Sequence, residues 1–156
     1  MIVVADTSPL NYLVLIDHIE ILAQLYRRVF IPFAVQSELR NAKTPQPVRD
    51  WIGNPPDWLE VRSITPPLDP SLADLDQGEA EAIVLAEQLS VDRIVIDESL
   101  GRRIAESHGL QVIGTLGILR EASQRNLLDF HEAVGLLQKN GFHIAQNVLD
   151  KMFADL

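Results

Sequence analysis

The sequence predicts an α/β fold in which a parallel central sheet carries helices on both of its faces. Short apolar runs rich in Val and Ile alternate with segments of helical periodicity from Ile2 to Arg125, a pattern typical of parallel sheets. The runs are apolar at most positions rather than at every second one, as expected of strands buried on both faces. The chain has 156 residues and a hydrophobic fraction of 47%, so we expect a single domain over residues 1–156.

Five segments are expected to be strands because they are short and rich in β-branched residues. The first of them, IVVA, is followed by Asp6, and the fourth, RIVI, is followed by Asp97. Three prolines between residues 66 and 70 place a loop after the third strand. The predicted strands are residues 2–5, 29–31, 59–64, 93–96 and 111–113.

The segments between and after the strands have helical spacing and recognisable ends. Thr7 and Ser8 are good capping residues, and Pro9 is suited to a first helical turn. Gly109 is a typical helix terminator. Two further helices, split by Asn140-Gly141, form a C-terminal pair at about 129–155 that we expect to pack on the same domain. The predicted helices cover about 9–14, 19–26, 32–39, 48–52, 80–89, 100–108, 115–125, 129–139 and 144–153.

Composition excludes several classes of protein. The chain has no cysteine, which excludes a disulfide scaffold, cysteine zinc sites and thiol catalysis. No apolar run approaches the ~20 residues of a membrane span, and Asp6 interrupts the first run, so we expect a cytoplasmic protein without a signal peptide. The net charge of −9 argues against a general nucleic-acid coat, because phosphate binding depends on Lys and Arg.

Acidic residues follow two of the predicted strands and occur on two predicted helices. Ligands of parallel sheets bind beyond the carboxyl ends of the strands, which is where Asp6 and Asp97 lie. Glu38 and Glu79 are expected early on helices that follow loops, so that their side chains reach the same edge. Four carboxylates at one site repel one another and require a cation.

The chemistry of such a site follows from its ligands. Oxygen-only ligands favour Mg²⁺ or Mn²⁺ over zinc or copper. One or two such ions can bridge a scissile phosphate, activate a water and stabilise the leaving oxygen. The site would therefore need no Ser, His or Cys nucleophile, and the four histidines show no metal-ligand spacing.

Five short motifs, taken together in their order, resemble those of PIN-domain proteins, and more closely those of the VapC-like toxins and their relatives of unassigned function. The motifs are VADTS (4–8), VQSEL (35–39), GEAEAI (78–83), IVIDE (94–98) and GTLGIL (114–119). The resemblance covers nearly the whole chain. It implies a three-layer sandwich fold and a metal-dependent ribonuclease, often a toxin restrained by a cognate antitoxin.

The resemblance also assigns roles to individual residues. It implies that Asp6, Glu38, Glu79 and Asp97 are the catalytic and metal-binding acids. Ser8 matches a small hydroxyl residue that supports the first Asp. Glu98 follows the fourth acid, where relatives often have Asp, and Glu79 is one methylene longer than the Asp common at its position.

Each residue also has a simpler interpretation. Asp6 could cap a helix, Glu38 could be a solvated helix residue, and Glu79 could favour the positive end of its helix. Thr115 is either a helix cap or a residue that orders a water near the metals. Arg102 and Arg103 are either surface charge or contacts to RNA phosphate.

The sequence therefore favours two functions. The first is a Mg²⁺- or Mn²⁺-dependent endoribonuclease, the toxin of a type II toxin–antitoxin pair, with an RNA substrate, a cognate antitoxin as partner and a homodimeric state. The second is a non-catalytic module that keeps the PIN fold and binds RNA or protein.

Overall fold

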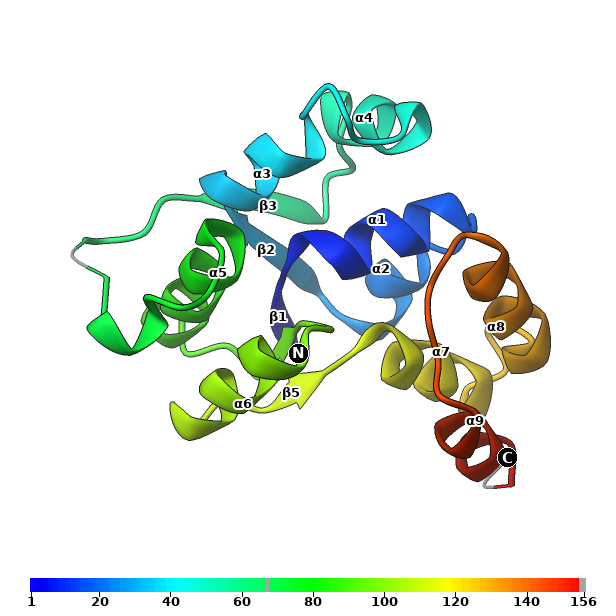
Figure 1. Ribbon diagram of the computed structural model, residues 1–156. Helices are drawn as coiled ribbons and strands as arrows, with labels where there is room; N and C mark the ends of the chain where they lie inside the picture. The colour runs from blue at the N-terminus through cyan, green and yellow to red at the C-terminus, as the bar shows by residue number, and fades with distance from the viewer. Residues whose placement is uncertain (67, 155–156) are drawn as a thin grey trace.

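The computed structural model describes residues 1–66 and 68–154 and places a five-stranded sheet at the centre of the molecule (Figure 1). The strand order is β3-β2-β1-β4-β5, and every neighbouring pair is parallel. The predicted α/β class with a parallel central sheet is confirmed. The strands are β1 (Ile2–Ala5), β2 (Arg28–Pro32), β3 (Leu59–Arg62), β4 (Arg93–Val95) and β5 (Val112–Ile113).

The helices connect these strands and extend beyond the last of them. Most begin within two residues of the predicted position, but α5 begins three residues earlier, because Asp76 caps it by accepting a hydrogen bond from the N–H of Glu79. The helices are α1 (Thr7–Leu15), α2 (Ile21–Leu25), α3 (Phe33–Leu39), α4 (Gln46–Gly53), α5 (Gln77–Gln88), α6 (Ser99–Ser107), α7 (Thr115–Gln124), α8 (Phe130–Lys139) and α9 (Gln146–Ala154), with a short 3₁₀ turn, η1 (Pro70–Leu72).

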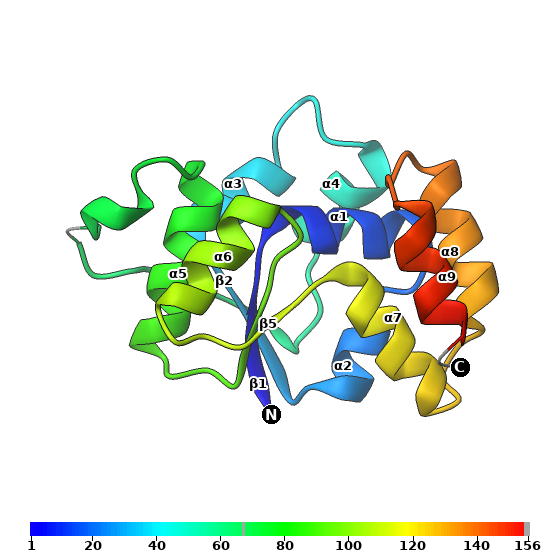
Figure 2. The same ribbon diagram turned by 60° about the horizontal axis from the view of Figure 1, so that its bottom comes forward.

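Successive strand residues point to opposite faces, and both faces are buried. Val3, Val29 and Val95 belong to a core formed mainly with α1, α2, α4, α7, α8 and α9, to which α3 also contributes two buried residues. Val4 and Ile94 belong to a second core formed mainly with α5 and α6. Figure 2 shows these two sets of helices on opposite sides of the sheet. The continuous apolar character of the strands is explained by this double coverage.

The two C-terminal helices pack beside α1 and α7 (Figures 1 and 2). Phe130 and Leu137 of α8 and Leu149 of α9 are buried in the first core, and the rings of Phe130 and Phe153 meet edge to face at 5.6 Å. The end of the predicted helical pair at residue 155 lies outside the described residues. Among the helices that the structure describes, none is long and apolar enough to cross a membrane.

Candidate active site

The predicted acids lie where the order of the sheet reverses. The chain builds outward from β1 through β2 and β3, and then returns to the other side of β1 with β4 and β5. Asp6 directly follows β1, and its N–H donates to the carbonyl of Val95 at 2.9 Å. Asp97 lies two residues beyond Val95. The carboxyl ends of β1 and β4 therefore form a topological switch point, the usual ligand site of such sheets.

Asp6 is buried without a full set of partners. It is only 4% exposed, and its Oδ1 has no hydrogen-bond partner within the described part of the chain. Burial raises the pKa of Asp6 to about 7, against the lowering effect of the Thr7 backbone, and the negative charges of Asp76, Glu38 and Asp97 raise it further. Although Asp6 is the N-cap of α1 by its backbone, its side chain makes no capping hydrogen bond. Capping alone does not explain this residue.

Glu38 reaches the same edge from a different place than expected. It is the next-to-last residue of α3, so the expectation that it lies early on its helix is wrong; the last turn of α3 instead reaches Thr7, the residue after Asp6. Its Oε2 accepts a 2.5 Å hydrogen bond from the hydroxyl of Thr7. A Cβ at Gly78 would collide with the Glu38 carboxylate, so the glycine allows this carboxylate to lie against the start of α5. Burial raises the pKa of Glu38, while the Thr7 bond lowers it.

Glu79 lies in the first turn of α5 and is 6% exposed. Its Oε2 has no hydrogen-bond partner among the described residues. A Cβ at Gly101 of α6 would lie 2.6 Å from this oxygen, so the carboxylate occupies space that the glycine leaves open. Burial raises the pKa of Glu79 to about 8, and the neighbouring carboxyls of Asp76 and Asp6 contribute in the same direction.

Asp97 is held by Thr115, the first residue of α7. The Thr115 N–H donates to Oδ1 at 2.8 Å, and the Thr115 hydroxyl donates to Oδ2 at 2.7 Å. Burial raises the pKa of Asp97, whereas these two bonds and the charge of Arg102 lower it. Thr115 is fully buried and follows the N-cap Gly114, so its hydroxyl fixes Asp97 instead of capping the helix.

The remaining predicted residues lie around these acids. Ser8 and Glu98 line a cavity of about 560 Å³ together with Asp6, and Glu98 is also the N-cap of α6. Arg102 is partly buried and donates to the carbonyl of Ile96 at 3.4 Å. Arg103 is exposed.

The structure brings the four acids to one edge but does not place them around a single cavity. Asp6 and Glu38 line the 560 Å³ cavity together with Asp76. Asp97 lines a neighbouring cavity of about 600 Å³, and Glu79 is buried at the start of α5. Asp6 connects the set, because the charges of Glu38 and Asp97 act on it and its own charge acts on Glu79.

The donors at this edge fit a hard divalent cation. They are all oxygens, and the unpaired buried oxygens of Asp6 and Glu79 need a partner. Within residues 1–66 and 68–154, however, no three His, Cys, Asp or Glu side chains already stand as a ligand set. The acids therefore lie near one another without forming a complete coordination site. Mg²⁺ tolerates this, because it commonly binds through one or two carboxylates and keeps several waters.

Sequence reasoning missed two residues of this site. Asp76 lines the cavity and raises the pKa values of Asp6, Glu38 and Glu79. Its signal is the D-x-x-E pattern of residues 76–79, which by itself indicates only a helix start. Thr7 holds Glu38, a contact across 31 positions that no local pattern encodes.

An all-parallel sheet covered on both faces, with acids gathered at its switch point, defines a PIN-like α/β sandwich. The chain belongs to the PIN domain family, because a PIN domain family model matches residues 2–156. PIN domains are generally nucleases and typically use divalent metal ions, so the fold is of a nuclease type.

One solved structure confirms the fold. It is a PilT N-terminus domain protein from the hyperthermophilic archaeon Sulfolobus solfataricus P2, which is 17% identical, with a TM-score of 0.53. The match covers 94% of this chain and 98% of the archaeal chain. Comparison with curated proteins gave no match.

Proposed function

We propose that this protein is a Mg²⁺- or Mn²⁺-dependent endoribonuclease that acts as the toxin of a type II toxin–antitoxin pair. The observation that carries the catalytic part is the pair of buried, unpaired carboxylate oxygens on Asp6 and Glu79 at the switch point of the sheet. Uncompensated buried carboxylates destabilise a fold, so their presence is best explained by a ligand. A divalent cation is the partner that satisfies both.

The residues at this edge would have different roles in such a site. Asp6, Glu79 and Asp97 would hold the cation, which supplies Lewis acidity and a water of lowered pKa. Thr115 orients the Asp97 carboxylate, and Thr7 orients that of Glu38. Lys43 lines the cavity beside Asp6, where its positive charge would attract an RNA phosphate.

We expect the purified protein to cleave single-stranded or structured RNA only when Mg²⁺ or Mn²⁺ is added. EDTA should stop the reaction and excess Mn²⁺ should restore it, because the acids alone repel the phosphate. Gel analysis of labelled RNA checks this. Equal cleavage in EDTA by a nuclease-free preparation would refute the metal mechanism.

A second candidate is a module that binds RNA or protein without cleaving. The absence of a finished ligand set among the described residues and the net charge of −9 favour it. The same assay separates the two, since this candidate binds RNA or a partner but leaves it intact with Mn²⁺. Expression in growing cells also separates the two candidates. The catalytic proposal predicts growth arrest, and the binding module does not. A cognate antitoxin would be recognised as a small protein, encoded beside this chain, whose co-expression relieves that arrest.

We also propose that the protein is a homodimer joined through an apolar helical surface. Phe33, the first residue of α3, is 53% exposed and is the most exposed of the large hydrophobic residues in the described part of the chain. Light scattering at micromolar concentration should give twice the 17.4 kDa chain mass, and Phe33→Glu should give the monomer mass, because a charge there would be desolvated on association. A monomeric wild type would contradict the proposal.

A further inference from the structure

The cavity beside Asp97 extends from the start of α6 to α9. It has a volume of about 600 Å³ and is bounded by α6, β5, the start of α7 and the segment from Phe142 to α9. Asp97, Ser99 and Arg102 are its polar lining on the side of α6. Small ligands bind in cavities of about 300–1,000 Å³. The cavity therefore has room for a molecule the size of one nucleotide beside a candidate catalytic acid.

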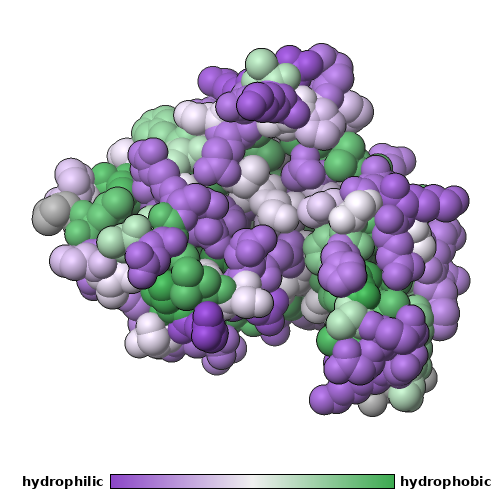
Figure 3. All heavy atoms as spheres, viewed as in Figure 1, coloured by the Kyte–Doolittle hydropathy of each residue, from purple (hydrophilic) through white to green (hydrophobic). Residues whose placement is uncertain are grey.

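The opposite wall of this cavity is apolar. Leu116 of α7, Phe142 and Val148 of α9 line it. The ring of Phe142 is held edge to face by Tyr12 at 4.9 Å, and Val148 is 41% exposed. Over α7 and α9, Figure 3 shows hydrophobic residues interleaved with hydrophilic ones. Accessible apolar side chains thus face the polar residues of α6 across one cavity.

Arg102 brings a positive charge to the polar side. Within the described part of the chain, its guanidinium makes one hydrogen bond, to the carbonyl of Ile96 at 3.4 Å. A Cβ at Gly114 would lie 2.5 Å from Nη1 of Arg102 and 2.9 Å from Oδ1 of Asp97, so both charged groups lie against this glycine. A guanidinium has five donors, and most of those of Arg102 are therefore available to an anion beside Asp97.

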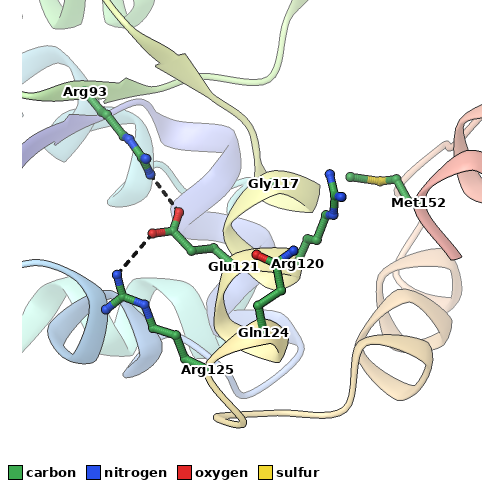
Figure 4. Close-up of a pocket in the computed structure, with 7 residues that line it drawn as sticks. All are labelled: Arg93, Gly117, Arg120, Glu121, Gln124, Arg125 and Met152. Atoms are coloured by element: carbon green, nitrogen blue, oxygen red, sulfur yellow. Dashed lines mark hydrogen bonds and ion pairs between the residues drawn. The ribbon is translucent and has the colours of Figure 1, made fainter. Parts of the chain in front are cut away.

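Arg102 differs in this respect from two arginines beyond Gly117. Gly117 also lines an adjoining cavity of about 510 Å³. There Glu121 accepts from Arg93 at 2.7 Å and from Arg125 at 3.4 Å, as Figure 4 shows. The charges of Arg93 and Arg125 are thus already engaged by a carboxylate. A phosphate in the Asp97 cavity would meet Arg102 instead.

We propose that this cavity is a subsite for one nucleotide of the RNA, in which Arg102 holds the phosphate next to the scissile one and an unpaired base lies against Phe142 and Val148. The inference rests on the proposed function and adds a substrate requirement to it. A base can enter only where it is unpaired, in a single strand or a loop. Its flat faces suit the apolar wall, and His143, which also lines the cavity, has ring nitrogens that can hydrogen-bond its polar edge.

The base contact is tested by binding in EDTA, separately from cleavage. Fluorescence anisotropy compares a short labelled single-stranded RNA with an abasic oligomer, the same sugar-phosphate chain without bases. We expect the full-length wild type to bind the RNA on the order of tenfold more tightly, because bases add stacking contacts. Val148→Asn removes apolar surface without adding charge, so it should reduce this preference and leave binding of the abasic oligomer unchanged. Val148→Ile is the matched control and should keep the preference.

The phosphate contact is tested in the same assay. Arg102→Gln should weaken binding of both oligomers about fivefold near 0.1 M salt and lower the slope of the salt dependence by about 0.7, because one phosphate contact of a single strand is lost. Arg103→Gln removes the same charge from the exposed residue beside it and should change binding little.

The outcomes separate the subsite from the proposed function. If RNA is cleaved with Mn²⁺ but the wild type does not prefer RNA to the abasic oligomer, or Arg102→Gln binds like Arg103→Gln, the subsite is wrong and the nuclease stands. If nothing is cleaved but the variants lose binding as expected, the subsite stands and the protein is an RNA-binding module.

Two further results would also overturn the subsite. An equal loss for both oligomers in Val148→Asn would show a structural effect instead of a base contact. Tighter binding of an acidic peptide rich in apolar residues than of RNA would assign the cavity to a protein partner. Melting curves show that each variant is folded, and Arg102→Gln tests the cavity even if Val148→Asn is not.

Discussion

Asp97→Asn is expected to lower the rate of RNA cleavage by more than about 100-fold while the protein stays folded. The substitution keeps the shape of the side chain and removes a hard anionic ligand. Loss of a residue that only orients a metal ligand typically costs 10- to 100-fold, so loss of a ligand itself should exceed that range. Asp6→Asn should have the same effect, because Asp6 lies at the centre of the acidic site. The negative charges of Asp76, Glu38 and Asp97 all act on its carboxylate.

Two further variants give this prediction a graded control. Glu98→Gln should cost far less, since Glu98 is exposed and its side chain makes no capping hydrogen bond at the start of α6. Thr115→Val should fall between them, because it removes the hydroxyl bond to Asp97 and leaves the backbone bond. Single-turnover rates at saturating Mn²⁺ provide the measurement. If both Asp variants retain near-native rates, the strand-end acids are not the catalytic site.

The stability of the metal-free protein is expected to fall as pH rises from about 4 to about 8. Asp6 and Glu79 have pKa values raised to about 7 and about 8, whereas carboxyls of the unfolded chain titrate near 4. Between those values the folded state binds more protons than the unfolded state, so the free energy of unfolding decreases with pH. The loss of stability is complete above about pH 8, where both acids are ionised in the folded state. It is absent below about pH 4.

Asp6→Asn should therefore stabilise the metal-free protein at pH 8 by up to about 4 kcal/mol, since the pKa of Asp6 is raised from 3.8 to about 7 and each pKa unit corresponds to about 1.4 kcal/mol. The gain should shrink at pH 5, where the folded Asp6 is already protonated. Asp97→Asn is the matched comparison. It should gain less, because both oxygens of Asp97 accept hydrogen bonds from Thr115 and the amide nitrogen of Asn cannot replace one of them.

Metal binding should restore the stability that the wild type loses when its buried acids ionise. A cation that binds only the folded state stabilises it by about 2.7 kcal/mol at a hundredfold excess over its dissociation constant. Chemical denaturation in EDTA and in millimolar Mn²⁺, at pH 5 and pH 8, measures both effects, and Asp6→Asn should blunt the metal response. If Mn²⁺ leaves the wild type unchanged and Asp6→Asn destabilises it at pH 8, the acids do not share a cation.

Local patterns in the chain account for most of the secondary structure and for the positions of the strand-end acids. A short apolar β-branched run predicts a buried strand, and the residue that follows it lies at the carboxyl edge of a parallel sheet. Asp6 and Asp97 are therefore predictable from the amino-acid sequence alone. The pattern of five motifs added Glu38 and Glu79 through resemblance to PIN domains, since neither glutamate has a distinctive local signal.

The way these residues are held, and the way they titrate, depend instead on tertiary packing. The strand order places β1 beside β4, which joins Asp6 to Asp97 across 91 positions of the chain. Packing of α3 against α5 brings Glu38 to Gly78, and packing of α6 leaves Glu79 against Gly101. Desolvation of the acids likewise depends on segments distant in sequence. Such distances are set by the packing of whole elements, and local periodicity carries no information about them.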